Sequence, residues 1–198
     1  LRSGKKIYNV LQLRLHKKIQ ELKEKFSSVD ILRKVKIELT YITSRGKWYD
    51  YSWKSDISKS GGVVTNIGIH FFDMLQWIFG KTIKNELHFA DNHRAGGFLE
   101  LKNAEIKWFL SIDRNDLSMD VRNSGKTTFR SLTIDKEEFE FSEGFTDLHT
   151  EIYREILQGN GFRIGEARDS IQIAYNIRNA KPIGIQDYSN EFLKGIQI

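Results

Sequence analysis

The sequence predicts an α+β fold, in which a largely antiparallel, open sheet carries helices packed on one face. Two observations support this class. After residue 80 the predicted strands outnumber the helices, and short turns separate several of them. Before residue 80 lies a mostly apolar segment with two glycines at its start and one at its end, which is typical of a buried helix.

The first 60 residues predict two strands, a helix and a loop. Within residues 7–15 leucines alternate with polar residues, so we expect a strand there. Residues 16–26 predict an exposed helix with lysines on its outer face. Residues 35–42 alternate as a second strand, and residues 45–60 predict a long loop rich in polar and aromatic residues.

The second half of the chain is expected to supply most of the sheet. Its strands are expected at residues 85–93, 97–101, 105–112, 127–135 and 138–141, the last two forming a hairpin. Two helices should follow, at residues 146–158 and 163–179. Thr146 is the expected N-cap of the first helix, and Pro182 lies beyond the end of the second.

Composition excludes several classes of protein. The 198 residues are 39% hydrophobic without a long apolar run, so we expect no membrane span and no signal peptide. The absence of cysteine excludes disulfides and thiolate metal sites, and it is compatible with the cytoplasm. The net charge of +5 is spread over the chain without a basic run, so we expect no nucleic-acid partner.

Polar residues line one side of the apolar helix predicted after Gly61 and Gly62. At about 100° per residue, Asn66, His70 and Asp73 share one narrow stripe. Buried polar groups need partners, so this stripe either faces a functional cleft or satisfies itself. In the second case Thr65 or Asn66 is an N-cap and His70 is a core imidazole that is hydrogen-bonded to Asp73.

The loop at residues 45–60 has two interpretations as well. It holds four cations, two tryptophans and two tyrosines. Aromatic faces can bind a sugar or uracil ring, while Arg and Lys can hold a diphosphate or carboxylate. Alternatively, the loop is amphipathic and its aromatic residues cover the core.

The order Gly61-Gly62-x-x-x-Asn66-x-x-x-His70-x-x-Asp73-x-x-x-Trp77-x-x-Gly80 resembles the signature helix of the Gfo/Idh/MocA oxidoreductases. The resemblance implies that His70 is catalytic, beside a nicotinamide and a sugar. Asn66 stands where many members have Asp, which is similar to the nucleotide-sugar branch of the family. The family binds NAD through an N-terminal Rossmann domain, and its C-terminal domain is an open sheet with helices on one face.

Two further stretches resemble one branch of this family, the dehydrogenases that oxidise carbon 3 of UDP-N-acetylglucosaminuronic acid for bacterial surface-polysaccharide and lipopolysaccharide synthesis. They are Gln12-Leu13-Arg14-Leu15-His16 and the run from Thr43 to Lys54. The match covers residues 7–180. It implies His70 as general base and Asn66 as the residue that orients the sugar. It also implies substrate-binding residues: Arg14, His16, Arg45, Trp48, Tyr49, Trp53, Lys54, Ser60 and Gly61.

Two stretches imitate phosphate loops without fulfilling the pattern. Residues 123–127, Asn-Ser-Gly-Lys-Thr, lack the leading glycine of a Walker A motif, so we expect a hairpin turn. Residues 159–165 have the wrong glycine spacing for a dinucleotide loop and follow a helix, so we expect a helix stop.

No G-x-G-x-x-G fingerprint occurs in the chain, so NAD should bind mainly to a domain that this sequence lacks. We therefore expect residues 1–28 to be a remnant leading from the nucleotide-binding domain, and residues 29–198 to form the substrate-binding and oligomerisation domain. Homo-oligomers should form through the outer sheet face. The alternative is a non-catalytic sugar-nucleotide-binding or assembly module of the same fold.

Overall fold

The computed structural model describes residues 4–28, 33–139, 141, 145 and 147–195. Their main feature is a six-stranded sheet with the strand order β3-β4-β5-β2-β6-β7, beside a separate pair of β1 and β8. The neighbours β2 and β5 are parallel, and the other neighbouring pairs of the sheet are antiparallel. The strands are β1 (Tyr8–Asn9), β2 (Val35–Thr43), β3 (Thr82–Ala90), β4 (Arg94–Leu101), β5 (Ala104–Ser111), β6 (Thr128–Ile134), β7 (Glu137–Glu138) and β8 (Phe162–Arg163). The predicted fold class is confirmed.

The helices vary greatly in length, and α1, α4, α6 and α7 exceed two turns. The α-helices are α1 (Lys17–Ser27), α2 (Trp48–Tyr51), α3 (Ile57–Ser60), α4 (Ile69–Phe79), α5 (Met119–Asn123), α6 (Leu148–Leu157), α7 (Arg168–Asn179) and α8 (Glu191–Lys194). The 3₁₀ helices are η1 (Gln12–Leu15), η3 (Arg114–Asp116) and η4 (Ile164–Ala167), and η2 (Val64–Gly68) is a π-helical turn. None of the helices in the described ranges has the length and apolar character needed to cross a membrane.

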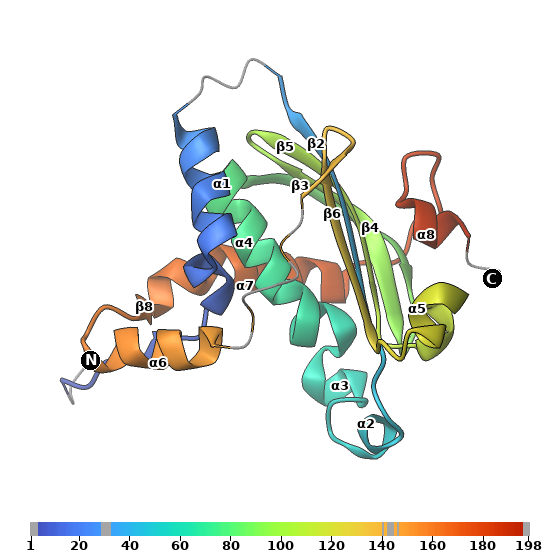
Figure 1. Ribbon diagram of the computed structural model, residues 1–198, viewed down its shortest axis with the longest axis horizontal. Helices are drawn as coiled ribbons and strands as arrows, with labels where there is room; N and C mark the ends of the chain where they lie inside the picture. Colours follow the sequence, from blue (N-terminus) through green and yellow to red (C-terminus); the bar gives the residue numbers. More distant parts are fainter. Residues whose placement is uncertain (1–3, 29–32, 140, 142–144, 146, 196–198) are drawn as a thin grey trace.

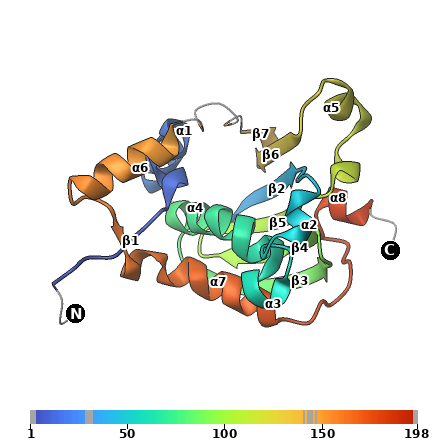
Figure 2. The same cartoon turned by 90° about the horizontal axis from the view of Figure 1, so that it is seen from below.

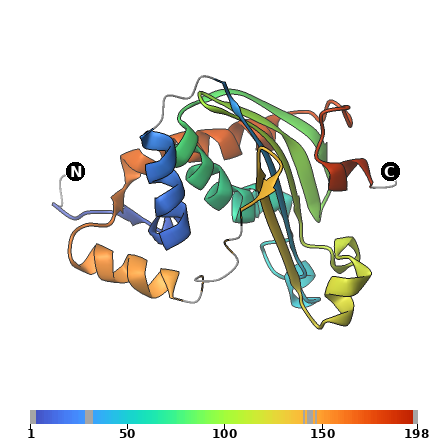
Figure 3. The same ribbon diagram turned by 45° about the horizontal axis from the view of Figure 1, so that its top comes forward.

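The long helices form a layer on one side of the sheet. α1, α4 and α7 lie together on this side (Figure 1), and α4 runs beside α7 when the molecule is seen from below (Figure 2). The short helix α8 lies on the opposite side of the sheet, as the tilted view shows (Figure 3). The predicted helical layer is confirmed, and the cover on the other face was not predicted.

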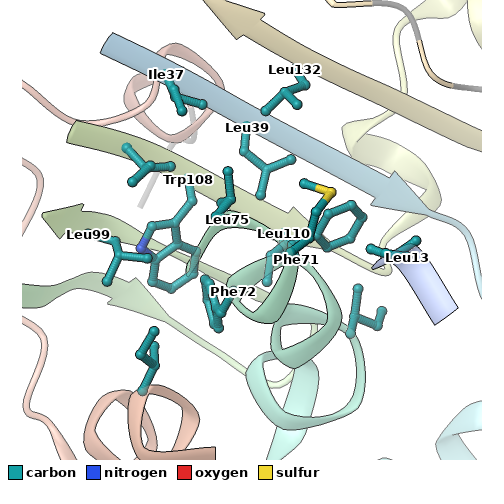
Figure 4. Close-up of a cluster of buried hydrophobic side chains, with 14 of the residues drawn as sticks. Leu13, Ile37, Leu39, Phe71, Phe72, Leu75, Leu99, Trp108, Leu110 and Leu132 are labelled. Carbon is teal, nitrogen blue, oxygen red and sulfur yellow. The ribbon is translucent and has the colours of Figure 1, made fainter. Parts of the chain in front are cut away.

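The core lies between α4 and the middle of the sheet. Phe72 and Leu75 point from α4 toward Leu39 of β2 and Trp108 of β5 (Figure 4). The rings of Phe72 and Trp108 meet edge to face, with centroids 5.4 Å apart. All four side chains are fully buried, and each contributes about 1.5–3 kcal/mol by leaving water. This burial fixes the height and rotation of α4 on the sheet.

The C-terminal segment crosses the edge of the sheet and covers part of its outer face. The backbone N–H of Ile183 donates to the carbonyl of Leu87 on the edge strand β3. Further on, Asn190 is buried and donates its side-chain amide to the carbonyl of Leu39 (3.1 Å). Phe109, which points to the outer face, is buried there by this segment.

Two local predictions were wrong. Residues 11–15 form no strand: β1 ends at Asn9, and η1 follows. A strand would point Arg14 away from Leu13, whereas in η1 both side chains are buried. Residues 123–127 form no hairpin turn, because they end α5 and lead into β6 through Gly125 (φ 75°). Residues 45–60 are also more regular than a loop, since they include α2 and α3.

The other predicted elements agree with the structure. The strands β2 to β6 and the helices α1 and α6 start and end within three residues of the predicted bounds. The helix predicted at residues 163–179 ends as predicted but begins only at Arg168, because β8 and η4 occupy the residues before it. Asp135 (φ 49°) and Lys136 (φ 74°) form the tight turn between β6 and β7, as the predicted hairpin requires. The helix stop at Gly159 (φ 86°) is confirmed. The expected N-cap Thr146 lies outside the described residues.

Candidate functional site

Two glycines turn the chain from α3 into the helix that leads through η2 to α4. Gly61 (φ 77°) and Gly62 (φ 69°) both have left-handed backbone, which glycine adopts without a steric cost. Ser60 stabilises this turn. Its hydroxyl donates to the carbonyl of Lys54 (2.8 Å) and accepts from the N–H of Gly62 (2.9 Å). The predicted site residues Ser60 and Gly61 are thus buried and shape the turn.

The helix begins with the π-helical turn η2, which carries Asn66. Such wide turns are frequent at functional sites. The amide of Asn66 donates to the carbonyl of Gly62 (3.0 Å), so the side chain is held above the glycine turn. At the end of η2, a Cβ on Gly68 would lie only 2.9 Å from Leu110 of the sheet. Glycine therefore allows η2 to press against the sheet while Asn66 stays partly exposed.

His70, in the first turn of α4, has the properties of a general base. Its side chain is half-buried. Burial lowers the pKa of His70, the negative charge of Asp73 opposes this effect, and the nearby His149 adds to it. A neutral imidazole near pH 7 can accept a proton from a substrate hydroxyl.

Asp73 is paired with Arg14 rather than with His70. Nε and Nη2 of Arg14 donate to the two carboxylate oxygens, at 2.8 and 2.7 Å. The core-histidine interpretation, in which His70 is bonded to Asp73, is therefore not what the structure has. Because Arg14 is buried and bound to the protein itself, its placement speaks against the predicted direct contact with substrate.

The loop before the glycine turn carries Arg45 and Tyr49. Tyr49 is buried, and its hydroxyl donates to the carbonyl of Lys54 (3.2 Å). Burial raises the pKa of Tyr49, while the positive charge of Arg45 and the nearby Asn66 side chain oppose that rise. Tyr49 is therefore the predicted site residue on which both Arg45 and Asn66 act.

The other predicted site residues are placed differently. The side chains of Trp48 and Trp53 are 56% and 59% exposed, and Lys54 is exposed. These residues are available to a ligand at the surface of the loop. His16 is buried at the end of η1, where its ring lies 5.1 Å from the ring of Phe145, so it is part of an aromatic cluster.

One side chain near the site carried no signal in the sequence. His149, at the start of α6, is close enough for its charge to act on His70. It is a single residue far along the chain from His70, and only the fold brings it near. The described residues include no group of three His, Asp or Glu that could hold a metal ion.

Known proteins are similar to this chain in sequence and in fold. Residues 31–119 match the family model described as the C-terminal alpha/beta domain of the GFO_IDH_MocA oxidoreductase family. These residues form a C-terminal domain of the Gfo/Idh/MocA family. The chain is similar to the WlbA (WbpB) dehydrogenase from Thermus thermophilus, solved in complex with NAD and α-ketoglutarate. The identity is 46% and the TM-score 0.89, over 96% of this chain and 62% of that one.

A second structure of the Thermus thermophilus dehydrogenase, in complex with NAD and UDP-GlcNAcA, is 45% identical, with a TM-score of 0.88, over 96% of this chain and 61% of that one. The WlbA dehydrogenase from Bordetella pertussis shares the fold at 17% identity and a TM-score of 0.65, over 93% of this chain and 65% of that one. The chain that contains this Gfo/Idh/MocA domain thus spans less than two thirds of the length of these dehydrogenases.

Proposed function

We propose that this chain is the substrate-binding part of an NAD-dependent dehydrogenase that oxidises carbon 3 of UDP-N-acetylglucosaminuronic acid or a closely similar UDP-sugar. The observation that carries the proposal is the 45% identity to a WlbA dehydrogenase solved with NAD and UDP-GlcNAcA. Asn66 and His70 support it, because they lie one helical turn apart and offer a side chain fixed by its own hydrogen bond beside a proton acceptor.

In the proposed reaction His70 removes the proton from the 3-hydroxyl group of the sugar. The lowered pKa keeps the imidazole neutral and ready to accept this proton at neutral pH. Asn66, held at Gly62 by its own amide, orients the sugar relative to His70. When NAD is bound, its nicotinamide supplies the hydride acceptor.

This chain alone does not supply the usual site for NAD. Its sequence contains no G-x-G-x-x-G, the loop whose backbone approaches the pyrophosphate of a dinucleotide. The residues of this chain therefore fit only part of NAD. His70 and Asn66 suit the edge of a nicotinamide site, and the binding energy for the rest of the cofactor must come from another nucleotide-binding unit.

The loop before the glycine turn is proposed to recognise the UDP-sugar. Arg45, beside Tyr49, carries a charge that suits the carboxylate or the diphosphate. Lys54, in the same loop, is exposed and can neutralise further phosphate charge. Trp48 and Trp53 present exposed ring faces to which a uracil or sugar ring can bind.

The wider setting belongs to the same proposal. A UDP-sugar dehydrogenase of this kind would serve surface-polysaccharide or lipopolysaccharide synthesis and act in the cytoplasm. It would work as a homo-oligomer that associates through the outer sheet face. Neither a nucleic acid nor a membrane is needed as a partner.

Isothermal titration calorimetry tests the substrate class directly. The chain should bind UDP-N-acetylglucosaminuronic acid more tightly than UDP-N-acetylglucosamine, which differs by lacking the carboxylate. Arg45→Gln should remove most of this preference. Arg114→Gln, which removes an equal charge from the exposed end of η3, is the matched control and should keep it. Equal binding of both sugars by the unmodified chain would contradict the proposed substrate.

A further inference from the structure

The pair formed by Arg14 and Asp73 lies one helical turn beyond His70. Both partners are buried, with 9% and 3% of their side chains exposed. The bond is bidentate, which is the strongest arrangement available to an arginine and a carboxylate. An ion pair this close to a proposed general base must influence it, either through the position of α4 or through its charge.

Arg14 holds more than one element. Its Nη2 also donates to the carbonyl of Glu166 in η4 (3.2 Å), and its Nη1 lies 3.6 Å from the Glu166 carboxylate. The guanidinium lies over the ring of Phe162 in β8 (5.1 Å) and that of Trp77 in α4 (5.9 Å). Arg14 thus joins η1, α4, β8 and η4 at one point.

The charges near His70 come from two sides. Asp73, on the same helix, favours the protonated imidazole, and His149, on α6, disfavours it. Asp73 is paired with Arg14, and Arg14 in turn lies near the half-exposed carboxylate of Glu166. An unpaired buried carboxylate would favour the protonated form of a nearby imidazole and so raise its pKa. When the carboxylate is paired with a guanidinium, the positive charge compensates most of its negative charge, and this effect is smaller.

We propose that Arg14 is a positioning residue for His70. By holding both carboxylate oxygens of Asp73, Arg14 fixes α4 and prevents Asp73 from bonding to the imidazole of His70. This inference rests on the proposed function, in which His70 is the general base. It replaces the direct substrate contact that the sequence suggested for Arg14. It also gives a role to Asp73, which no step of the proposed reaction uses.

Replacing Arg14 and replacing Asp73 should shift the pKa of His70 in opposite directions. If Arg14 is replaced by Gln, Asp73 is left uncompensated and the pKa of His70 should rise. If Asp73 is replaced by Asn, the attraction for a proton is lost and the pKa of His70 should fall. In the double variant both charges are gone, so the pKa of His70 should lie between those of the single variants. We expect each single change to move it by about half to one pH unit.

Histidine-detected NMR titration of the full 198-residue chain measures this directly. The chain has five histidines, and the signal of His70 is identified by its absence from a His70→Asn variant. Shifts of opposite sign in Arg14→Gln and Asp73→Asn would support the proposal. Shifts of the same sign, or none in either variant, would overturn it, because a purely structural role predicts similar damage from either change.

A second variant keeps the test decisive if Arg14→Gln does not fold. Arg14→Lys keeps the positive charge but cannot form the bidentate bond. We expect its His70 titration to stay close to that of the unmodified chain, while the thermal stability falls. A His70 titration that moves as far as in Asp73→Asn would contradict the compensating role of the charge at position 14.

Turnover separates this inference from the proposed function. In the NAD-dependent dehydrogenase that contains this chain, the acidic limb of the pH profile of kcat/KM should move in each variant as the NMR titration does. If the NMR titrations move in opposite directions while the pH profile stays fixed, the positioning role stands and His70 is not the general base. If the NMR titrations do not move, the positioning role fails whatever the pH profile does.

Discussion

Asp73 lies one turn after His70 on α4, and both of its carboxylate oxygens accept hydrogen bonds from Arg14 rather than from His70. This arrangement is not the hydrogen bond between His70 and Asp73 that one of the two interpretations of the sequence requires. A histidine needed to satisfy Asp73 would be structural. Because Arg14 already satisfies Asp73, the imidazole can be replaced without leaving a buried carboxylate unpaired.

His70→Asn should therefore slow turnover without unfolding the protein. We expect kcat of the NAD-dependent enzyme to fall by about 10² to 10⁴, the usual contribution of a general base. Affinity for the UDP-sugar and the melting temperature should change little. Both quantities should be measured on one preparation, with His93→Gln at an exposed turn as the control. Unchanged turnover together with a lowered melting temperature would make His70 structural.

The purified 198-residue chain should produce no NADH from any UDP-sugar. The reason is the missing dinucleotide fingerprint, without which the chain cannot supply most of the binding energy for NAD. Absorbance of NADH, followed with UDP-N-acetylglucosaminuronic acid and excess NAD, measures this. The same preparation should still bind the sugar in calorimetry, which shows that the chain is folded. Steady NADH production would mean that this chain holds the cofactor by a different motif.

A buried histidine on the edge strand β3 predicts how stability depends on pH. His88 is almost fully buried, with Nδ1 2.7 Å from the Ser189 hydroxyl. Burial lowers the pKa of His88, although the charge of Glu86 partly opposes this. The unfolded chain therefore binds a proton more readily than the folded one. The stability from neutral His88 is present above pH ~6.5 and is lost as the pH falls below that value.

Thermal melts between about pH 8 and pH 5 test this dependence. The melting temperature should fall on the acidic side, and the fall should be smaller in His88→Gln than in the unmodified chain. His93→Gln, at an exposed position, should keep the full decrease. A decrease that is equal in His88→Gln and the unmodified chain would show that other groups cause it. Because Ser189 lies in the C-terminal segment, that segment should loosen first.

The strands and the long helices could be predicted from the sequence because their patterns are local. In β2, Val35, Ile37 and Leu39 are buried while Lys36 is exposed, which is the alternation of a strand with one face on the core. Leucines at 11, 13 and 15 gave the same signal and were misleading. There the position of Arg14 is set by Asp73, 59 residues away, and no local pattern reports such a pair.

The candidate site could be predicted only in part for the same reason. The resemblance to known oxidoreductases predicted His70 and Asn66, and the fold places Tyr49 near Asn66. Whether the remaining predicted residues bind substrate stays a prediction. The cover of the outer sheet face was missed, because the C-terminal segment forms only the four-residue helix α8 and is anchored through the buried polar side chain of Asn190.

The outer sheet face, where self-association is expected, is partly covered by the chain itself. Phe109 of the outer face packs against Phe192 of its own chain, with ring centroids 6.3 Å apart. The neighbouring part of the outer face is instead charged, with Lys36, Glu38 and Lys107 around one hollow. A dimer that uses this face would rely on charge pairs, so salt should weaken it.

Sedimentation at tens of micromolar, roughly the range where a standard interface holds, measures this association. Dimers should form at low salt and dissociate as salt rises. Lys107→Glu should weaken the dimer, whereas Lys181→Glu, on the exposed turn after α7, should not. Monomers alone at low salt would contradict association through the sheet face.

The last prediction concerns the turn that positions Asn66. Gly61 and Gly125 have almost the same left-handed backbone, with φ values of 77° and 75°. Their surroundings differ: a Cβ on Gly61 would overlap the Thr65 hydroxyl and lie 2.8 Å from Thr65 Cβ, whereas nothing lies within 4 Å of a Cβ on Gly125. Gly125→Ala should cost about 1 kcal/mol from the backbone alone, and Gly61→Ala about 2–4 kcal/mol, since steric overlap adds to that strain.

Chemical denaturation measures the loss of stability in each variant. The difference between the two losses gives the cost of the steric overlap at Gly61, since the shared backbone strain cancels. Because the Asn66 amide is held by the carbonyl of Gly62, a shift of this turn also moves the side chain that orients the sugar. Gly61→Ala should therefore weaken UDP-sugar binding in calorimetry, while Gly125→Ala should not. If the two variants lose the same stability and bind the sugar equally well, the glycine turn is not what positions Asn66.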